Sequence, residues 1–357
     1  MYHWSVPVLL LIASGYLYHK PAYNWDMFPY MALTATTPEV PMDTTHELIY
    51  REAARLLPPH DFKAISNIQP ARMQSAAAFQ EILKYYEIKP GYVMMTRILY
   101  AWGFNLVAAT YFPSILSYFL MGCILWWWMM KLFDHPVAIV ITLLVAASPF
   151  LVQTARYSSP DMLCALLLLG GICLIAKVSI PVGMILCGLA IPVRPDSAIL
   201  FLLVVLAVYK SEKLKLTHAL VCALAGLGTT LWVVGGFDIL KEYLFTVPGY
   251  SEAWTANELI KNYLLGLRTG INSMINSHAW IFAVVAVLAL YIRGRQGIAI
   301  SKDLWSLLMM SAMVAVVARY LMHPVLEDRF LIASYLVVFI GLCKTIASTS
   351  SPKTSVI

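Results

Sequence analysis

The fold of this chain is decided by residues 92–109, which read YVMMTRILYAWGFNLVAA. The stretch is short for a membrane span, contains Arg97 and Asn105, and is interrupted by Gly103. We therefore predict a re-entrant or interfacial helix here rather than a span. This choice decides on which side of the membrane every later loop lies.

The composition around this stretch predicts an integral membrane protein. The chain has 357 residues, 60% of them hydrophobic and 12% charged, which is more apolar surface than a soluble core of this size buries. Apolar runs recur from Val6 to Ile346, so a single polytopic domain covering residues 1–357 is expected. The formal charge of +6 fits basic cytoplasmic loops and requires no nucleic-acid partner. All six cysteines lie in apolar runs, without the spacing of disulfides or metal sites.

Outward from residues 92–109, the chain is predicted to form about ten transmembrane helices. The first, near residues 4–19, has no basic residue before its apolar core and no cleavage site after it. A retained helix is therefore favoured over a signal peptide. The other nine are expected near residues 111–130, 136–153, 162–176, 179–193, 197–209, 217–236, 278–292, 304–321 and 330–345. The fold class is thus all-α.

The long polar loop at residues 20–110 is predicted to carry amphipathic interfacial helices. The letters TTHE at residues 44–47 are typical of a capping box that begins a helix running to Leu57. A second helix near residues 74–86 has an apolar face that includes Phe79 and Leu83. We expect both apolar faces to lie against the membrane interface.

Charge divides the loops between two sides. With ten spans, most loop lysines fall on one side, which the positive-inside rule makes cytoplasmic. The other side receives the first loop, a second long loop at residues 237–277, and three short turns at residues 156–161, 192–196 and 323–329. These turns contain carboxylates and arginines, so the chemistry is expected at the outer face.

Two aspartates are the candidate acid–base groups. Asp26 lies in the aromatic segment YNWDMFPY at residues 23–30, where a partly desolvated carboxylate is a better base for a hydroxyl proton. A helix-end cap is the alternative. Asp161 follows Ser158-Ser159-Pro160, a pattern typical of a helix N-cap, but its outer location equally indicates a site residue.

Several cations are predicted to share that outer face. Lys89 precedes residues 92–109 at the depth of a lipid headgroup, and Arg319 falls in an otherwise apolar helix. An arginine there is costly unless it is paired or binds an anion, although snorkelling explains any single one. Several cations lie on one face beside carboxylates, so a lipid phosphate is their expected partner. These cations are Lys89, Arg156, Arg319 and Arg329.

The order of these elements resembles the GT-C superfamily of integral membrane glycosyltransferases, and most closely its members that use polyprenyl-phosphate sugars. The likeness is best over residues 1–200 and is carried by Trp25-Asp26, Lys89-Pro90-Gly91-Tyr92, Pro160-Asp161, Arg194-Pro195-Asp196 and Glu327-Asp328-Arg329. It implies that Asp26 is the catalytic base, that Asp161 is a second acidic residue of the active site, and that Lys89 binds the donor phosphate. Further substrate contacts are expected from Trp25, Tyr92, Arg194, His323 and Glu327.

Many members of that superfamily follow the first-loop aspartate with a second acidic residue, whereas Met27 follows here. The sequence therefore names no cofactor and no metal ligand, and it leaves a divalent metal open.

The expected function is inverting transfer of a sugar from a polyprenyl-phosphate carrier to an acceptor hydroxyl. The acceptor is a glycan, a lipid-linked saccharide or a protein, and the expected location is a bacterial inner membrane with the site facing the periplasm. The alternatives are a flippase or transporter of lipid-linked saccharides, a polymerase that joins them, and a non-catalytic assembly subunit. Transporters place charges near the bilayer midplane, whereas these charges lie at one end of the predicted spans.

Overall fold

The computed structural model of the protein describes residues 4–37, 39–235, 264, 265, 268, 278–322 and 327–350. Every regular element in these residues is a helix, which confirms the all-α prediction. Most of the predicted second outer loop, residues 237–277, and the site candidate His323 lie outside the described residues.

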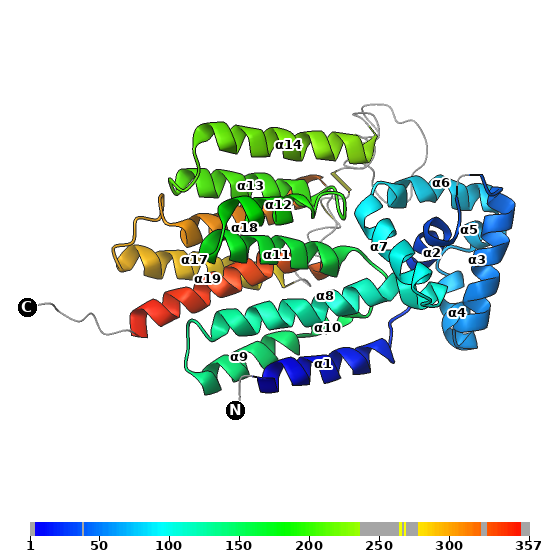
Figure 1. The fold of residues 1–357 in the computed structure, drawn as a ribbon, viewed down its shortest axis with the longest axis horizontal. Coiled ribbons are helices and arrows are strands. Elements are labelled where there is room, and N and C mark those ends of the chain that lie inside the picture. Colours follow the sequence, from blue (N-terminus) through cyan, green and yellow to red (C-terminus); the bar gives the residue numbers. More distant parts are fainter. Residues whose placement is uncertain are drawn as a thin grey trace, which may run out of the picture.

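The helices divide into a bundle and a cap that covers one end of it (Figure 1). The bundle contains α1 (Ser5–Tyr18), α8 (Leu106–Met129), α9 (His135–Ala146), α10 (Pro149–Ala155), α11 (Asp161–Lys177), α12 (Ile180–Gly188), α13 (Ser197–Lys210), α14 (Leu216–Val234), α17 (Ala279–Arg295), α18 (Leu304–Met322) and α19 (Ile332–Ser350). The cap contains α2 (Met27–Ala35), α3 (Met42–Leu56), α4 (Pro59–Ser66), α5 (Pro70–Gln74), α6 (Ala76–Glu87) and α7 (Pro90–Ala101).

The bundle has the helices of a membrane protein. Among the described residues, α8, α14, α18 and α19 are long and apolar enough to cross a membrane. The pair α9 and α10 passes the same test when taken together, with a bend of 59° at Ser148 and Pro149. Pro149 begins α10 because it lacks the N–H that would continue α9. The nine residues of α12 are about half of a full span.

Helices α11 and α12 approach each other closely through two glycines. A Cβ atom on Gly183 would lie 2.5 Å from the carbonyl oxygen of Gly171, and one on Gly171 would lie 2.3 Å from Sγ of Cys187. Small residues at such contacts let helix backbones approach within membranes. The two glycines therefore let α11 and α12 pack closely side by side.

The opposite end of the bundle is held together by contacts between its basic turns. Lys302 Nζ lies 2.5 Å from Glu212 Oε1, which joins the turn after α17 to the turn after α13. Lys177 Nζ at the end of α11 lies 5.9 Å from the ring of Trp128, which packs edge-on against Trp305 at 5.2 Å. The ends of α8, α11 and α13 and the start of α18 therefore lie together, away from the cap.

Residues 92–109 divide between two helices. Helix α7 ends at Ala101, and α8 begins at Leu106, where Asn105 Oδ1 accepts a hydrogen bond of 2.8 Å from Ala108 N. The prediction of one non-spanning helix is therefore wrong for residues 106–109. The asparagine begins the long helix five residues before the predicted Tyr111, because its side chain satisfies a free N–H of the first turn.

The predicted capping box at residues 44–47 is also wrong. Helix α3 begins at Met42 directly after Pro41, whose ring fixes the extended entry to the helix two residues earlier. The second predicted helix is confirmed as α6, with Phe79 and Leu83 buried.

The apolar faces of α3 and α6 were expected to lie against the membrane interface. In the structure they pack within the cap instead. Phe28 of α2 stacks on Tyr50 of α3 with ring centroids 4.6 Å apart. Trp25 meets Phe79 of α6 edge-on at 6.4 Å. The aromatic segment at residues 23–30 is thus the core of the cap, around which α3 and α6 fold.

Candidate functional site

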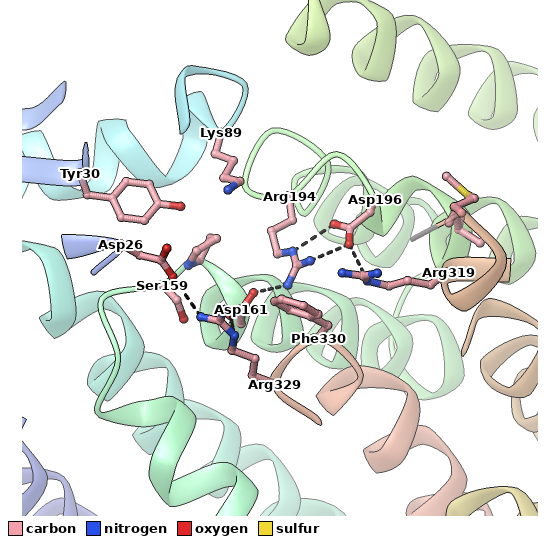
Figure 2. Close-up of a pocket in the computed structure, with 13 residues that line it drawn as sticks. Asp26, Tyr30, Lys89, Ser159, Asp161, Arg194, Asp196, Arg319, Arg329 and Phe330 are labelled. Carbon is pink, nitrogen blue, oxygen red and sulfur yellow. Dashed lines mark hydrogen bonds and ion pairs between the residues drawn. The ribbon is translucent and has the colours of Figure 1, made fainter. Parts of the chain in front are cut away.

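A cavity of about 170 Å³ lies where the cap meets the bundle (Figure 2). Charged side chains reach it from six separate segments of the chain. The cap contributes Asp26 and Lys89, and the bundle contributes Asp161, Arg194, Asp196, Arg319 and Arg329.

Two hydrogen bonds fasten the cap and the segment before it to the bundle beside this cavity. Gly91 N donates a hydrogen bond of 2.9 Å to Pro192 O, and a Cβ atom on Gly91 would lie 3.1 Å from the carbonyl carbon of Pro192. Asn24 Oδ1 accepts a hydrogen bond of 3.1 Å from Ser158 N. Lys89 and Asp26 are therefore held in register with the turns that carry Arg194 and Asp161.

Asp26 is held by three donors. Tyr86 Oη donates to Oδ1 at 2.6 Å, while Asn24 Nδ2 and Arg329 Nη1 donate to Oδ2 at 3.0 Å and 3.1 Å. The carboxylate precedes α2 but makes no capping hydrogen bond to it. An ionised carboxylate has about four acceptor positions, so one direction stays open toward the cavity.

Asp161 belongs to a chain of ion pairs. Arg194 donates through Nη1 to Asp161 Oδ1 and grips Asp196 with two hydrogen bonds of 3.0 Å and 2.6 Å. Arg329 Nε lies 3.7 Å from Asp161 Oδ2. Asp161 makes no capping hydrogen bond to α11, so the interpretation of this residue as an N-cap is corrected.

The chain of ion pairs continues at both ends. Arg319 Nε lies 2.9 Å from Asp196 Oδ2, and Arg329 pairs with Asp26 at 3.1 Å and with Glu327 Oε2 at 2.5 Å. All three arginines are thus oriented by carboxylates. Figure 2 shows the arginines and the aspartates of this chain lying close together at the cavity.

Phe330 places the three guanidinium groups around one ring. The Cζ atoms of Arg319, Arg194 and Arg329 lie 4.4 Å, 4.5 Å and 4.8 Å from its centroid. Arginines attract the face of an aromatic ring by a cation–π interaction. Without the ring and the carboxylates between them, three like charges at this spacing would repel one another.

Asp328 fixes the short helix η2 (Asp328–Phe330) that carries Arg329 and Phe330. Its carboxylate accepts hydrogen bonds from His278 N at 2.9 Å and from Tyr335 Oη at 2.8 Å, and it lies 2.6 Å from His278 Nδ1. The starts of α17 and α19 are therefore tied to the site.

Lys89 differs from the arginines in its surroundings. Its ammonium lies 4.7 Å from the ring of Tyr86 and 5.9 Å from that of Tyr30, and it forms no ion pair with any residue that the structure describes. Burial lowers the pKa of Lys89 to about 8, although Asp26 acts in the opposite direction. This ammonium is therefore available to an anion in the cavity.

The ion pairs set the charge of the other groups. Burial alone would raise the pKa of Asp196, but Arg194 and Arg319 outweigh it and lower the pKa to about 2. Burial opposes the charge of Arg329, yet Asp161, Asp26 and Glu327 raise its pKa above the ordinary arginine value. Both groups are charged at neutral pH.

Four predicted site residues do not line this cavity. Arg156 Nε donates to Lys20 O at 2.6 Å and so fastens the end of α1 instead of facing the cavity. Trp25 and Tyr92 are buried within the cap, Tyr92 with its hydroxyl on Thr110 O. Glu327 forms an ion pair with Arg329 but does not line the cavity. A fifth predicted residue, His323, lies outside the described residues.

The cavity residues that the prediction missed are either close in sequence to predicted ones or uncharged. Asp196 lies two positions after Arg194, and Phe330 directly follows Arg329, so both belong to turns with a predicted site residue. Tyr30 and Ser159 also line the cavity. Nothing in their local sequence distinguishes them from core residues.

Among the described residues, no group of three or more His, Cys, Asp or Glu side chains is arranged to hold a metal ion. The carboxylates of the cavity each face an arginine instead.

Comparisons with protein-family models, with curated proteins and with solved structures gave no match to this chain. The structure defines its class: a helical membrane protein with a charged cavity at one end of its apolar bundle.

Proposed function

We propose that this protein is a glycosyltransferase of the GT-C type that transfers a sugar from a polyprenyl-phosphate carrier to an acceptor hydroxyl. The observation that carries the proposal is the cavity in which Asp26 and four cations face one another at the end of an apolar bundle.

Asp26 is the proposed general base. Its open acceptor position takes the hydroxyl proton of the acceptor, while the oxygen of that hydroxyl forms a bond to the anomeric carbon. The bond between the anomeric carbon and the phosphate oxygen breaks, and its electron pair leaves with the lipid phosphate. Attack opposite the leaving group inverts the anomeric configuration.

The cations of the cavity are the proposed ligands of the donor phosphate. Four cations, Lys89, Arg194, Arg319 and Arg329, line the cavity. Each arginine is paired with a carboxylate, whereas Lys89 has no ion pair with any described residue, which leaves one unshared positive charge. A sugar-linked lipid phosphate is a diester with one negative charge, so the two match. Preorganised cations stabilise the second charge that develops as the phosphate leaves.

An apolar groove beside the site suits the carrier lipid. A cavity of about 330 Å³ lies between α17, α18 and α19, and its lining is almost entirely apolar, with Phe282, Met313 and Val338 among its residues. Tyr320 lines the groove and follows Arg319 directly in α18. A lipid whose phosphate lies at Arg319 can therefore extend its hydrocarbon chain between these helices.

The proposed orientation places the cap outside, in the periplasm of a bacterial inner membrane. The turns at the opposite end, together with the helix ends that adjoin them, carry nine lysines and arginines against three carboxylates, the pattern of cytoplasmic loops. Trp102 and Tyr100 at the end of α7 are exposed, as suits residues at a membrane interface. Ten crossings of the bundle would account for this distribution, with α9 and α10 as one bent crossing and the short α12 together with the turn after it as another.

The first test replaces Asp26 with asparagine, which keeps the shape but removes the base. We expect Asp26→Asn to lower turnover about 100- to 10,000-fold while changing donor affinity little. The measurement is release of farnesyl phosphate from synthetic glycosyl farnesyl phosphates, with a membrane lipid and glycan extract as acceptor. The matched control is Asp134→Asn, which removes an exposed carboxylate at the opposite end of the bundle.

A folded Asp26→Asn protein with wild-type turnover would exclude Asp26 as the base. The same assay separates the alternatives. A flippase moves the donor across a vesicle membrane without consuming it, and a polymerase does not turn over a monophosphate-linked sugar.

A further inference from the structure

Three buried polar atoms line the cavity without a hydrogen-bond partner among the described residues. They are Tyr30 Oη, Ser159 Oγ and Asp161 Oδ2. The three residues are only 1%, 1% and 4% exposed. Asp161 Oδ2 has only the long ion pair with Arg329 at 3.7 Å, and the two hydroxyls have no hydrogen-bond partner among the described residues. Buried polar atoms are nearly always hydrogen-bonded, so three such atoms around one cavity require an explanation.

Their positions show where a ligand would satisfy them. Tyr30 extends from α2 into the space between Asp26 and Lys89, and Ser159 precedes α11 in the turn that ends at Asp161 (Figure 2). The cap thus provides one of these atoms and the bundle the other two. Other buried atoms of the same kind, Tyr50 Oη and Ser14 Oγ, lie away from this cavity.

The chemistry of the three atoms favours a hydroxyl-bearing group over an anion, because an anion could accept from Tyr30 and Ser159 but would meet the carboxylate oxygen of Asp161 without a hydrogen to share. A carboxylate oxygen only accepts hydrogen bonds, while the phenol and the serine hydroxyl donate and accept. Burial raises the pKa of the Tyr30 phenol, so its proton stays in place. A group rich in hydroxyls offers both donors and acceptors, and it is the natural complement of this set.

We infer that Tyr30, Ser159 and Asp161 form a subsite that recognises the hydroxyl groups of the transferred sugar. Lys89 and the arginines hold the phosphate in the other part of the cavity. The inference rests on the proposed function and assigns Asp161 a role in sugar recognition rather than in proton transfer. The hydrogen bonds to Tyr30 and Ser159 form only if the hydroxyl groups of the sugar lie at matching positions. This subsite therefore selects which sugar is bound.

The test uses two ligands of equal charge. One is a panel of glycosyl farnesyl phosphates carrying different hexoses and pentoses, and the other is ethyl farnesyl phosphate, a diester without a sugar. Equilibrium binding to the purified protein in nanodiscs is measured for both. We expect the best glycosyl ligand to bind the wild-type protein at least about tenfold more tightly than the ethyl ester, because several hydrogen bonds contribute.

Two variants remove one hydroxyl each. Tyr30→Phe and Ser159→Ala are expected to weaken glycosyl binding about 2- to 12-fold while leaving the ethyl ester unaffected. The matched controls Tyr50→Phe and Ser14→Ala remove buried, unpartnered hydroxyls away from the cavity and should change neither affinity. Lys89→Met should weaken both ligands.

The outcomes separate the inference from the proposed function. If the wild-type protein binds neither ligand, the proposed function is wrong and the subsite falls with it. If it binds both equally, or if Tyr30→Phe and Ser159→Ala affect both alike or neither, only the hydroxyl subsite is overturned. Should a variant fail to fold, sugars lacking one hydroxyl at a time test the wild-type protein, and equal binding of every deoxy ligand contradicts the inference.

Discussion

Lys89 is the cation of the site that gains most from an anion. Each arginine already has a carboxylate within 3.1 Å, so a phosphate must share it with that carboxylate. Lys89 has only the rings of Tyr86 and Tyr30 near its ammonium. An anion that enters the cavity therefore meets its first unshared charge there.

Donor binding should depend on pH because burial lowers the pKa of Lys89 to about 8. Below pH 8 the ammonium is charged and attracts the phosphate, and above pH 8 it loses its proton and the attraction. Affinity for a glycosyl farnesyl phosphate, whose diester charge does not change in this range, should fall about tenfold or more between pH 7 and 9.5.

The control for this pH dependence is Lys89→Arg, since a guanidinium keeps its charge throughout the range. The variant should bind the donor with a flat profile over the same pH values. A flat profile in the wild-type protein, or the same fall in Lys89→Arg, would assign the pH dependence to another group.

At the scale of single elements, the pairing of α11 and α12 depends on two glycines. A Cβ atom on Gly183 would lie 2.6 Å from Ile175 Cγ1 and 2.7 Å from Ile175 N, as well as against Gly171 O. The backbone atoms cannot turn aside as a side chain would. Gly183→Ala should therefore lower the free energy of unfolding by about 1 to 3 kcal/mol, the usual cost of overpacking.

The measurement is thermal unfolding in detergent, and the matched control is Gly228→Ala in α14. A Cβ atom there meets nothing within 4 Å, and alanine is the better helix former, so the control should be neutral or stabilising. Equal melting temperatures for Gly183→Ala and the wild-type protein would show that α11 and α12 can separate without cost.

The sequence predicted elements well where the length of an apolar run decides the result. Helices α1, α11, α13 and α18 begin and end within one or two residues of the predicted spans. The prediction failed where one residue decides, as at Asn105, whose cap begins α8 early, and at Pro41, which begins α3. Such caps depend on local geometry that periodicity does not report.

Prediction of the site followed the same division. Arg319 was recognisable because an arginine in an apolar helix needs a partner, and the structure provides Asp196. Asp26 and Asp161 were recognisable as carboxylates beside apolar segments. Tyr30 and Ser159 were not, because an apolar helix and a turn commonly contain such residues, and only the folded cavity distinguishes them.

At the scale of the whole molecule, the proposed orientation predicts which surface is accessible from outside the cell. Arg51 is exposed on α3, and we expect the thiol of an Arg51→Cys variant to react with a membrane-impermeant maleimide in intact spheroplasts. A cysteine at Lys213→Cys, in the turn after α13, should react only after the membrane is opened. The unmodified protein, whose six cysteines lie in bundle helices, measures the background.

The opposite labelling pattern would place the cap in the cytoplasm and remove the periplasmic site. Labelling of both positions in intact spheroplasts would show a leaky preparation or a mixed topology. A soluble cytoplasmic protein with one exposed cysteine distinguishes the two, because it is labelled only if the membrane leaks.

The pair of Asp26 and Arg329 joins residues 303 positions apart, one before the first cap helix and the other just before α19. During synthesis Asp26 is made early, and its partner Arg329 is made only after nearly every helix of the bundle. A half-made chain therefore holds its proposed base without the guanidinium that orients it. The protein acquires its charged cavity only at the last stage of its own assembly, so immature copies in the membrane are expected to leave the lipid carrier pool untouched.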